Sequence, residues 1–167
     1  MKYLIIYGSS GSSTGKTMEV VNTLKEQLGA DFIDVSNCKI SFFDYAHNNK
    51  GDDFHGIAQQ MVSAECIIFA TPVYWYAMSA QLKVFFDRLS DLITIRKPLG
   101  RQLEGKVMTF VATGHDDLLP EGFYVPFKRT AEYFNMSYTE GMYICTNSKV
   151  FNQSEANEKM IQFAEGF

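Results

Sequence analysis

The chain has 167 residues, of which 46% are hydrophobic and 20% charged, and its formal net charge is −4. This length fits one domain, residues 1–167, that can bury a core without disulfides or metals. The acidic balance and the lack of a basic stripe argue against nucleic-acid binding, and the absence of 18 consecutive apolar residues argues against a membrane span.

Apolar runs and amphipathic segments alternate along the chain. Short continuous apolar runs such as YLIIY are typical of strands buried on both faces, whereas i, i+3, i+4 spacing of apolar residues predicts helices. In chain order the pattern predicts strands at 3–7, 31–35, 66–70, 106–112 and 137–145, and helices at 16–28, 53–64, from 79 onward, at 125–134 and from 154 onward.

Several residues mark the ends of these elements. Gly29 is a suitable C-cap for the first helix, and Ser79 is a suitable N-cap for the third. Pro98 and Gly100 are expected to break the chain. Residues 37–53 are mostly polar, with a few apolar residues among them, which predicts an irregular loop packed partly on the body.

The alternating order predicts the fold class. Strand, helix, strand, helix implies a parallel sheet with helices on both faces. We therefore expect an α/β protein of the flavodoxin-like type, a three-layer αβα sandwich around a five-stranded parallel sheet. Ligands of such sheets bind beyond the carboxyl ends of the strands, so the loops at 8–16, 71–79 and 113–123 are the candidate sites.

The first of these loops, YGSSGSSTGKT at residues 7–17, is suited to a phosphate. It lies between a buried strand and a helix, where backbone N–H groups and the helix dipole favour an anion. Hydroxyls and glycines supply further donors and a tight backbone. The candidate phosphate ligands are Ser9, Ser10, Gly11, Ser12, Ser13, Thr14, Gly15, Lys16 and Thr17.

Three motifs compete for this loop. Gly15-Lys16-Thr17 ends like a nucleoside-triphosphate loop, but that motif needs glycine where Ser10 stands, and GxGxxG is absent. Ser12 to Thr17 instead match the flavodoxin phosphate fingerprint [ST]-x-T-G-x-T. A Ser/Gly-rich turn that binds nothing is the alternative. A P-loop-like nucleotide-binding protein stays open as a remote possibility.

The segment ATPVYWYAMSAQLKVFFDRL, residues 70–89, adds a second resemblance. It is similar to the flavodoxin-like NAD(P)H-dependent FMN reductases, in which a proline and an aromatic loop follow the third strand. The resemblance implies FMN as cofactor and NADH or NADPH as co-substrate. It also implies that the flavin ring meets the second and third loops, through Pro72, Val73, Tyr74, Trp75, Tyr76, Ala77, Met78, Thr113, Gly114 and His115.

The expected function is that of an FMN-dependent oxidoreductase. It would pass electrons from NAD(P)H to a small acceptor, which could be a quinone, a flavin, a nitro or azo compound, or a metal ion. The flavin carries the chemistry, so no catalytic side chain is assigned. The alternative is a flavodoxin-type electron carrier that docks a protein partner. Related reductases are commonly dimers, so we expect a homodimer.

The remaining polar residues predict little chemistry. Cys38, Cys66 and Cys145 form no CxxC and no metal-ligand spacing, which favours a reducing compartment, an expected cytoplasmic location and no metal site. Cys66 and Cys145 are expected in the core. His47 and His55 lie away from the three loops and are expected at the surface.

Overall fold

A computed structural model describes residues 1–11 and 14–167. Within these residues, six strands form one parallel sheet in the order β2-β1-β3-β4-β5, and β6 also pairs with β4. The strands are β1 (Tyr3–Tyr7), β2 (Asp31–Asp34), β3 (Cys66–Pro72), β4 (Val107–Gly114), β5 (Ser137–Tyr138) and β6 (Met142–Cys145). The predicted parallel α/β fold is confirmed.

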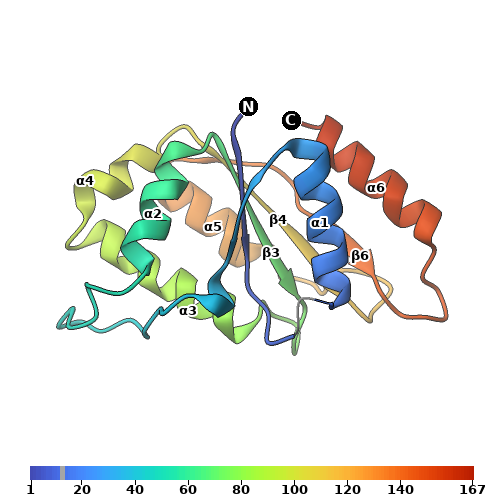
Figure 1. Ribbon diagram of the computed structural model, residues 1–167, viewed down its shortest axis with the longest axis horizontal. Coiled ribbons are helices and arrows are strands. Elements are labelled where there is room, and N and C mark those ends of the chain that lie inside the picture. Colours follow the sequence, from blue (N-terminus) through green and yellow to red (C-terminus); the bar gives the residue numbers. More distant parts are fainter. Residues whose placement is uncertain (12–13) are drawn as a thin grey trace.

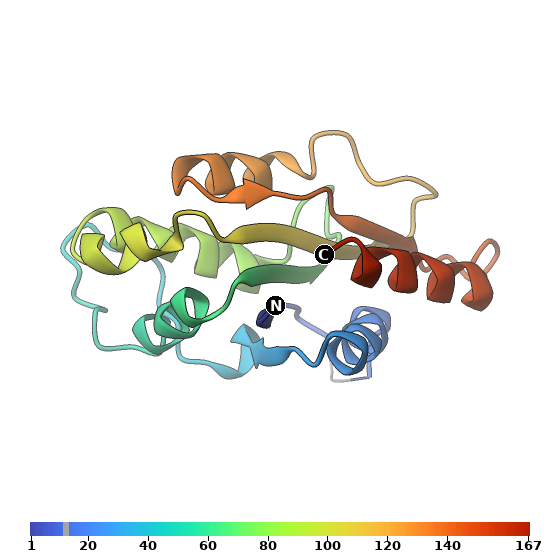
Figure 2. The same ribbon diagram turned by 90° about the horizontal axis from the view of Figure 1, so that it is seen from above.

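Helices cover both faces of this sheet (Figures 1 and 2). α1 and α6 lie on one face, and α2 to α5 lie on the other. The α-helices are α1 (Lys16–Leu28), α2 (Phe54–Ser63), α3 (Ala80–Arg88), α4 (Lys97–Gly100), α5 (Val125–Tyr133) and α6 (Gln153–Glu165). Three 3₁₀ turns, η1 (Val35–Asn37), η2 (Leu89–Ile93) and η3 (Arg101–Leu103), complete the described elements.

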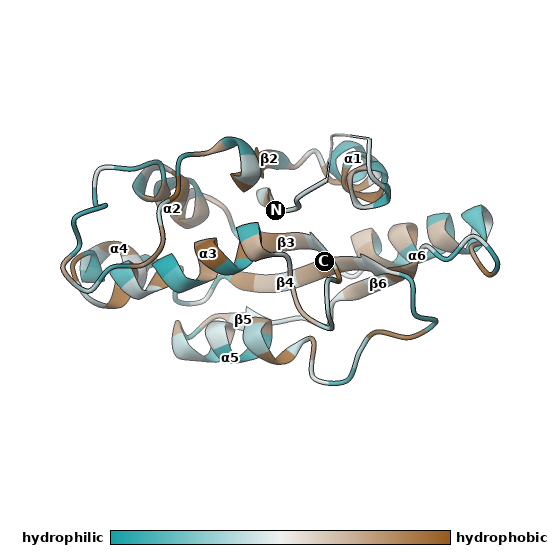
Figure 3. Cartoon of the chain, turned by 90° about the horizontal axis from the view of Figure 1, so that it is seen from below, coloured by the Kyte–Doolittle hydropathy of each residue, from teal (hydrophilic) through white to brown (hydrophobic). Residues whose placement is uncertain are grey.

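The two faces of the sheet carry separate hydrophobic clusters. Leu82 and Phe85 of α3 join Phe127 of α5 on one face, while Leu24 of α1 and Met160 of α6 pack on the other. Figure 3 shows hydrophobic colour along β3 and β4 in the middle of the molecule. A strand with helices on both faces has to be apolar on both sides, which is why all seven residues of β3 are buried.

The end of the sheet differs from the expected single strand at 137–145. Two short strands form there instead, and both pair with β4. Between the two strands Gly141 packs against the ring of Phe110, where a Cβ atom would come within 2.4 Å of the ring. The fold class is unchanged, but the sheet has six strands.

Both predicted helix caps are present, but Pro98 does not interrupt the helical structure as expected. Gly29 ends α1 in the left-handed conformation at φ 60°, and the Ser79 hydroxyl accepts a hydrogen bond from Leu82 N–H at the start of α3. Pro98 was expected to break the chain, yet it lies in the first turn of α4. Proline is tolerated there because the N–H it lacks would have no partner within the helix.

Candidate functional site

The three loops expected to form a site meet at one edge of the sheet. The hydroxyls of Thr17 and Thr113 lie 2.6 Å apart, which links the start of α1 to the end of β4. The Ser10 hydroxyl lies 3.2 Å from the phenol oxygen of Tyr74, and Val73 N–H donates to Thr113 O at 2.7 Å. Residues far apart in sequence therefore come together at the carboxyl ends of β1, β3 and β4.

Gly8 begins the first loop and packs closely against α3. A Cβ atom at this position would lie 2.9 Å from both the backbone N and the Cβ of Leu82. The Ser79 hydroxyl donates to Gly8 O at 2.7 Å, and the Ser36 hydroxyl donates to Ser9 O at 2.6 Å. The loop is thus held to α3 on one side and to η1 on the other.

The N-terminus of α1 has no side-chain cap from its N-cap residue. Its N-cap is Gly15, which has no side chain to satisfy the first N–H groups. Among the described residues, no hydrogen bond uses the N–H groups of Lys16 or Thr17. Free N–H groups at a helix start, together with the helix dipole, form a site for phosphate.

The ammonium group of Lys16 is paired with groups outside the loop at 8–16. It lies 2.7 Å from the Glu19 carboxylate and 5.5 Å from the centroid of the Phe151 ring. In a nucleoside-triphosphate loop the corresponding lysine reaches the phosphates. The arrangement of Lys16 therefore gives no support to that alternative.

The second loop presents aromatic side chains on a strained turn. Tyr74 N–H donates to Ala77 O at 2.9 Å and Ala77 N–H donates to Tyr74 O at 3.1 Å, which closes a tight turn. Trp75 and Tyr76 stand at its tip with φ of 48° and 65°, values that bulky residues rarely adopt. Trp75 is 92% exposed. Strain and exposed aromatic surface in one loop are typical of a binding site.

The third loop follows β4. Thr113 is buried, Gly114 is half-buried, and His115, Asp116 and Asp117 are exposed. Gly114 is packed against Tyr143 of β6, whose phenol oxygen would lie 2.7 Å from a Cβ atom at this position. The sequence analysis missed both Ser36, which binds Ser9 O, and Tyr143, which packs on Gly114. Each lies in an element, η1 or β6, that carries no recognisable motif.

Most of the predicted site residues lie at this same edge of the sheet, and they differ in how exposed they are to solvent. Buried members are Ser9, Thr17, Pro72, Met78 and Thr113. Half-buried members are Gly15, Val73 and Gly114. Exposed members are Ser10, Gly11, Thr14, Lys16, Tyr74, Trp75, Tyr76, Ala77 and His115. Ser12 and Ser13 lie outside the described residues.

Two of the residues expected elsewhere are placed differently. His47, expected at the surface, has a side chain only 18% exposed, and its Nδ1 lies 3.1 Å from Asp91 Oδ1. Cys145, expected in the core, is half-buried at the end of β6, whereas Cys66 is fully buried. Within the described residues, no group of three or more His, Cys, Asp or Glu is arranged to hold a metal ion.

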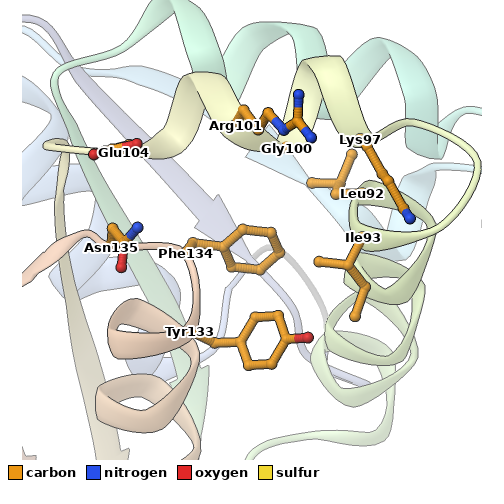
Figure 4. Close-up of a pocket in the computed structure, with 9 residues that line it drawn as sticks. All are labelled: Leu92, Ile93, Lys97, Gly100, Arg101, Glu104, Tyr133, Phe134 and Asn135. Atoms are coloured by element: carbon orange, nitrogen blue, oxygen red, sulfur yellow. The ribbon is translucent and has the colours of Figure 1, made fainter.

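A separate concavity lies away from the three loops, between η2, α4 and the end of α5 (Figure 4). It has a volume of about 220 Å³. The rings of Tyr133 and Phe134 point across it toward Leu92 and Ile93. A neighbouring hollow of about 300 Å³ shares Ile93, Tyr133 and Phe134, and the two adjoining hollows are together called the groove along α5.

Comparison with known proteins gives matches over nearly the whole chain. The sequence model described as NADPH-dependent FMN reductase matches residues 1–118. YwqN of Bacillus subtilis (strain 168), named as an NAD(P)H-dependent FMN-containing oxidoreductase, is 29% identical over 150 residues, which are 83% of this chain and 81% of that protein.

Solved structures share the fold at lower identity. The Trp repressor binding protein from Bacillus subtilis superposes with a TM-score of 0.75 at 22% identity, over 98% of this chain and 96% of that one. An FMN-dependent NADH-azoreductase from Bacillus anthracis, solved in complex with FMN, gives a TM-score of 0.70 at 12% identity, over 99% and 97% of the two chains.

Proposed function

The chain belongs to the NADPH-dependent FMN reductase family, and we propose that it holds FMN at the edge where its three loops meet and passes electrons to a small molecule. By family it is an FMN-dependent NAD(P)H oxidoreductase. The observation that carries it is the uncapped start of α1 beside the exposed aromatic turn at 74–77.

The residues at this edge fit FMN. A phosphate needs several donors, and the start of α1 offers the N–H groups of Lys16 and Thr17, which take part in no hydrogen bond with any residue that the structure describes. The flavin ring needs flat apolar contact, which the exposed side chains of Trp75 and Tyr76 supply. Among the described residues, no hydrogen bond uses the backbone N–H groups of Trp75 and Tyr76, so they are available to the polar edge of a ring.

We assign the phosphate to residues 9–17 and the ring to residues 72–78 and 113–115. When bound, FMN supplies hydride acceptance and electron transfer, so the chain needs no acid or base of its own. The work of these residues is to hold the phosphate, to orient the ring and to present donors where negative charge develops. His115 is exposed beside Gly114, from where its ring can donate to a flavin carbonyl.

The acceptor is proposed to be a small molecule such as a quinone, a free flavin, a nitro or azo compound, or a metal ion. An open edge supports this, since Trp75 and His115 are both exposed and leave the site accessible. We further propose that the whole chain acts as one FMN-binding domain in the cytoplasm, where its three free cysteines would stay reduced. None of the helices in the described part of the chain could cross a membrane.

A homodimer is also proposed, with the groove along α5 as its interface. Tyr133 is 68% exposed on the rim, and Ile93 and Val125 add further exposed apolar surface. The rim carries Lys97 and Arg101 together with Glu104, a mixture of charges that a second copy of the same surface can complement. Sedimentation velocity should show a dimer that Tyr133→Glu converts to a monomer. Tyr45→Glu, a change at another exposed tyrosine, should leave the dimer intact.

The test of the function is anaerobic reduction of the FMN-loaded protein. Absorbance of the flavin bands is followed after adding NADPH, and separately after adding NADH. Rapid bleaching supports the reductase, and the faster donor gives the nicotinamide preference. Absence of bleaching with both donors, while dithionite still reduces the bound FMN, would favour the electron carrier.

A further inference from the structure

The chain after β4 has an unusual arrangement of carbonyl groups. In a continuing strand, successive carbonyls alternate between the two neighbouring strands. Thr113 O follows this rule and accepts from Val73 N–H beside β3, at 2.7 Å. Gly114 O then turns to the other side, toward β6, and accepts from Thr146 N–H at 2.7 Å and from the Thr146 hydroxyl at 3.0 Å.

The alternation stops after Gly114. The Cys145 thiol lies 3.7 Å from His115 O, and the Tyr143 phenol donates to Asp116 O at 2.6 Å. Three consecutive carbonyls, those of residues 114, 115 and 116, are therefore all held by Tyr143, Cys145 and Thr146. These three donors belong to β6 or to the residue that follows it.

This arrangement fixes the direction of the next N–H groups. In a trans peptide the N–H of one residue points opposite to the carbonyl of the residue before it. The N–H of His115 therefore points away from Thr146, that of Asp116 away from the Cys145 thiol, and that of Asp117 away from the Tyr143 phenol. Across the described residues, no hydrogen bond uses any of the three. β6 and β3 lie on opposite sides of β4, so the N–H of His115, the first residue after β4, points to the side of β3 and the loop that follows it.

We propose that Tyr143 and Thr146 are positioning residues for FMN: they hold the carbonyls of residues 114–116 so that three successive N–H groups point toward the cofactor. The inference rests on the proposed binding of FMN at this edge. Successive free N–H groups form a nest that favours a negative partial charge. The pyrimidine edge of a flavin gains negative charge on reduction, so the nest should bind the reduced cofactor more strongly than the oxidised one.

Two properties of Tyr143 suit this role. Its phenol lies against Gly114, the one residue type that leaves room for it. Burial, with the nearby Cys145, Asp116 and Asp117, raises the pKa of Tyr143 to about 12, so the phenol stays a hydrogen-bond donor at neutral pH.

The test compares Tyr143→Phe with the wild type. The change removes the donor to Asp116 O and keeps the ring against Gly114. FMN affinity is measured by quenching of flavin fluorescence, and the reduction potential of the bound FMN is measured alongside. We expect FMN binding to weaken by about 2–10-fold, the usual effect of one lost hydrogen bond, with a larger loss for the reduced cofactor and hence a lower potential. Tyr138→Phe, the same change on β5, should alter neither.

Hydrogen exchange gives a readout that is independent of electron transfer. FMN should slow amide exchange at residues 115–117 in the wild type, and this protection should fall in Tyr143→Phe. Thr146→Val, which removes only the hydroxyl donor, should act in the same direction, and Thr146→Ser should restore binding.

The possible results distinguish a failure of FMN binding itself from a failure of the positioning role of Tyr143. If the wild type does not quench FMN fluorescence, the proposed function and this inference both fail. If the wild type binds FMN but Tyr143→Phe shows the same affinity, potential and amide protection, only the positioning role fails. An equal effect of Tyr138→Phe would also overturn it, because the loss would then be a general effect of removing a phenol from this end of the sheet.

Discussion

The buried hydroxyls of Thr17 and Thr113 lie 2.6 Å apart. They join the first turn of α1 to the end of β4, although the two residues are 96 positions apart in sequence. Each hydroxyl is the partner of the other. This bond fixes the distance between the start of α1, the proposed phosphate site, and the third loop.

Removing either hydroxyl should leave the other one buried without its partner, so the costs of the two changes should not add. Thr17→Val leaves the buried Thr113 hydroxyl without its partner, which should lower the free energy of unfolding by about 1–3 kcal/mol. Thr113→Val should do the same. In the double variant no hydroxyl is left unpaired, so the two losses should fall short of additivity by about 1 kcal/mol. Urea denaturation of the four proteins gives the coupling; strict additivity would contradict it.

Gly8 should be intolerant of a methyl group. Gly8→Ala places a Cβ atom against the backbone of Leu82, which cannot move without shifting α3, so we expect a loss of about 1–3 kcal/mol in unfolding free energy. Gly56→Ala is the control. Position 56 lies within α2 with open space around it, and alanine there should stabilise the protein by up to about 1 kcal/mol. Opposite signs of the two effects in thermal or urea unfolding are the expected result.

Arg88 is expected to be the most costly cation to remove. It is 1% exposed, contacts Asp52, binds Asp91 Oδ2 through Nε at 3.0 Å and Nη2 at 2.9 Å, and donates to Ser41 O at 3.1 Å. Arg88→Met leaves two carboxylates buried without their cation, for an expected loss of about 3–5 kcal/mol.

The control for Arg88 is Lys83→Met on the same helix, which breaks an exposed pair with Asp87. Its cost should be below about 1 kcal/mol, because solvent screens exposed pairs. Equal losses in the two variants, measured by urea unfolding, would show that the buried contacts of Arg88 with Asp52 and Asp91 contribute no more than an exposed ion pair.

The pairing of Asp52 with Arg88 should make the free energy of unfolding depend on pH in the acidic range. Burial raises the pKa of Asp52, but hydrogen bonds from Arg88, Ser41 N–H and Phe54 N–H outweigh it and lower that pKa below the ordinary value of 3.8. A depressed pKa means that the contribution is present above pH 3.8 and is lost as pH falls through the folded-state value. Unfolding free energies measured from pH 5 down to about pH 2.5 should fall less steeply in Asp52→Asn than in the wild type.

The turn at Trp75 and Tyr76 should be strained. Trp75→Ala and Trp75→Gly both remove the exposed ring, but only glycine adopts φ near 48° without cost. The glycine variant should therefore be more stable than the alanine variant by about 1 kcal/mol. Both should lose FMN affinity to a similar extent, since both lack the ring. A more stable alanine variant in thermal unfolding would show that the turn carries no strain.

The sequence by itself determined the parallel α/β architecture, because apolar runs alternate with amphipathic helices along the chain. It also located the three loops, since the carboxyl ends of parallel strands must meet at one edge. The motif at 12–17 and the aromatic loop at 74–76 then indicated phosphate and ring binding. These signals are local in sequence, and each is readable from a few neighbouring residues.

Tertiary structure alone decided what joins the loops. The contacts of Thr17 with Thr113, of Ser36 with Ser9, and of Tyr143 with Asp116 O link segments that share no sequence pattern. The close packing of Gly141 on the ring of Phe110, between β5 and β6, is likewise a tertiary contact. A hydrogen bond or a close packing contact depends on distances set by the whole fold, so no single stretch of residues encodes it.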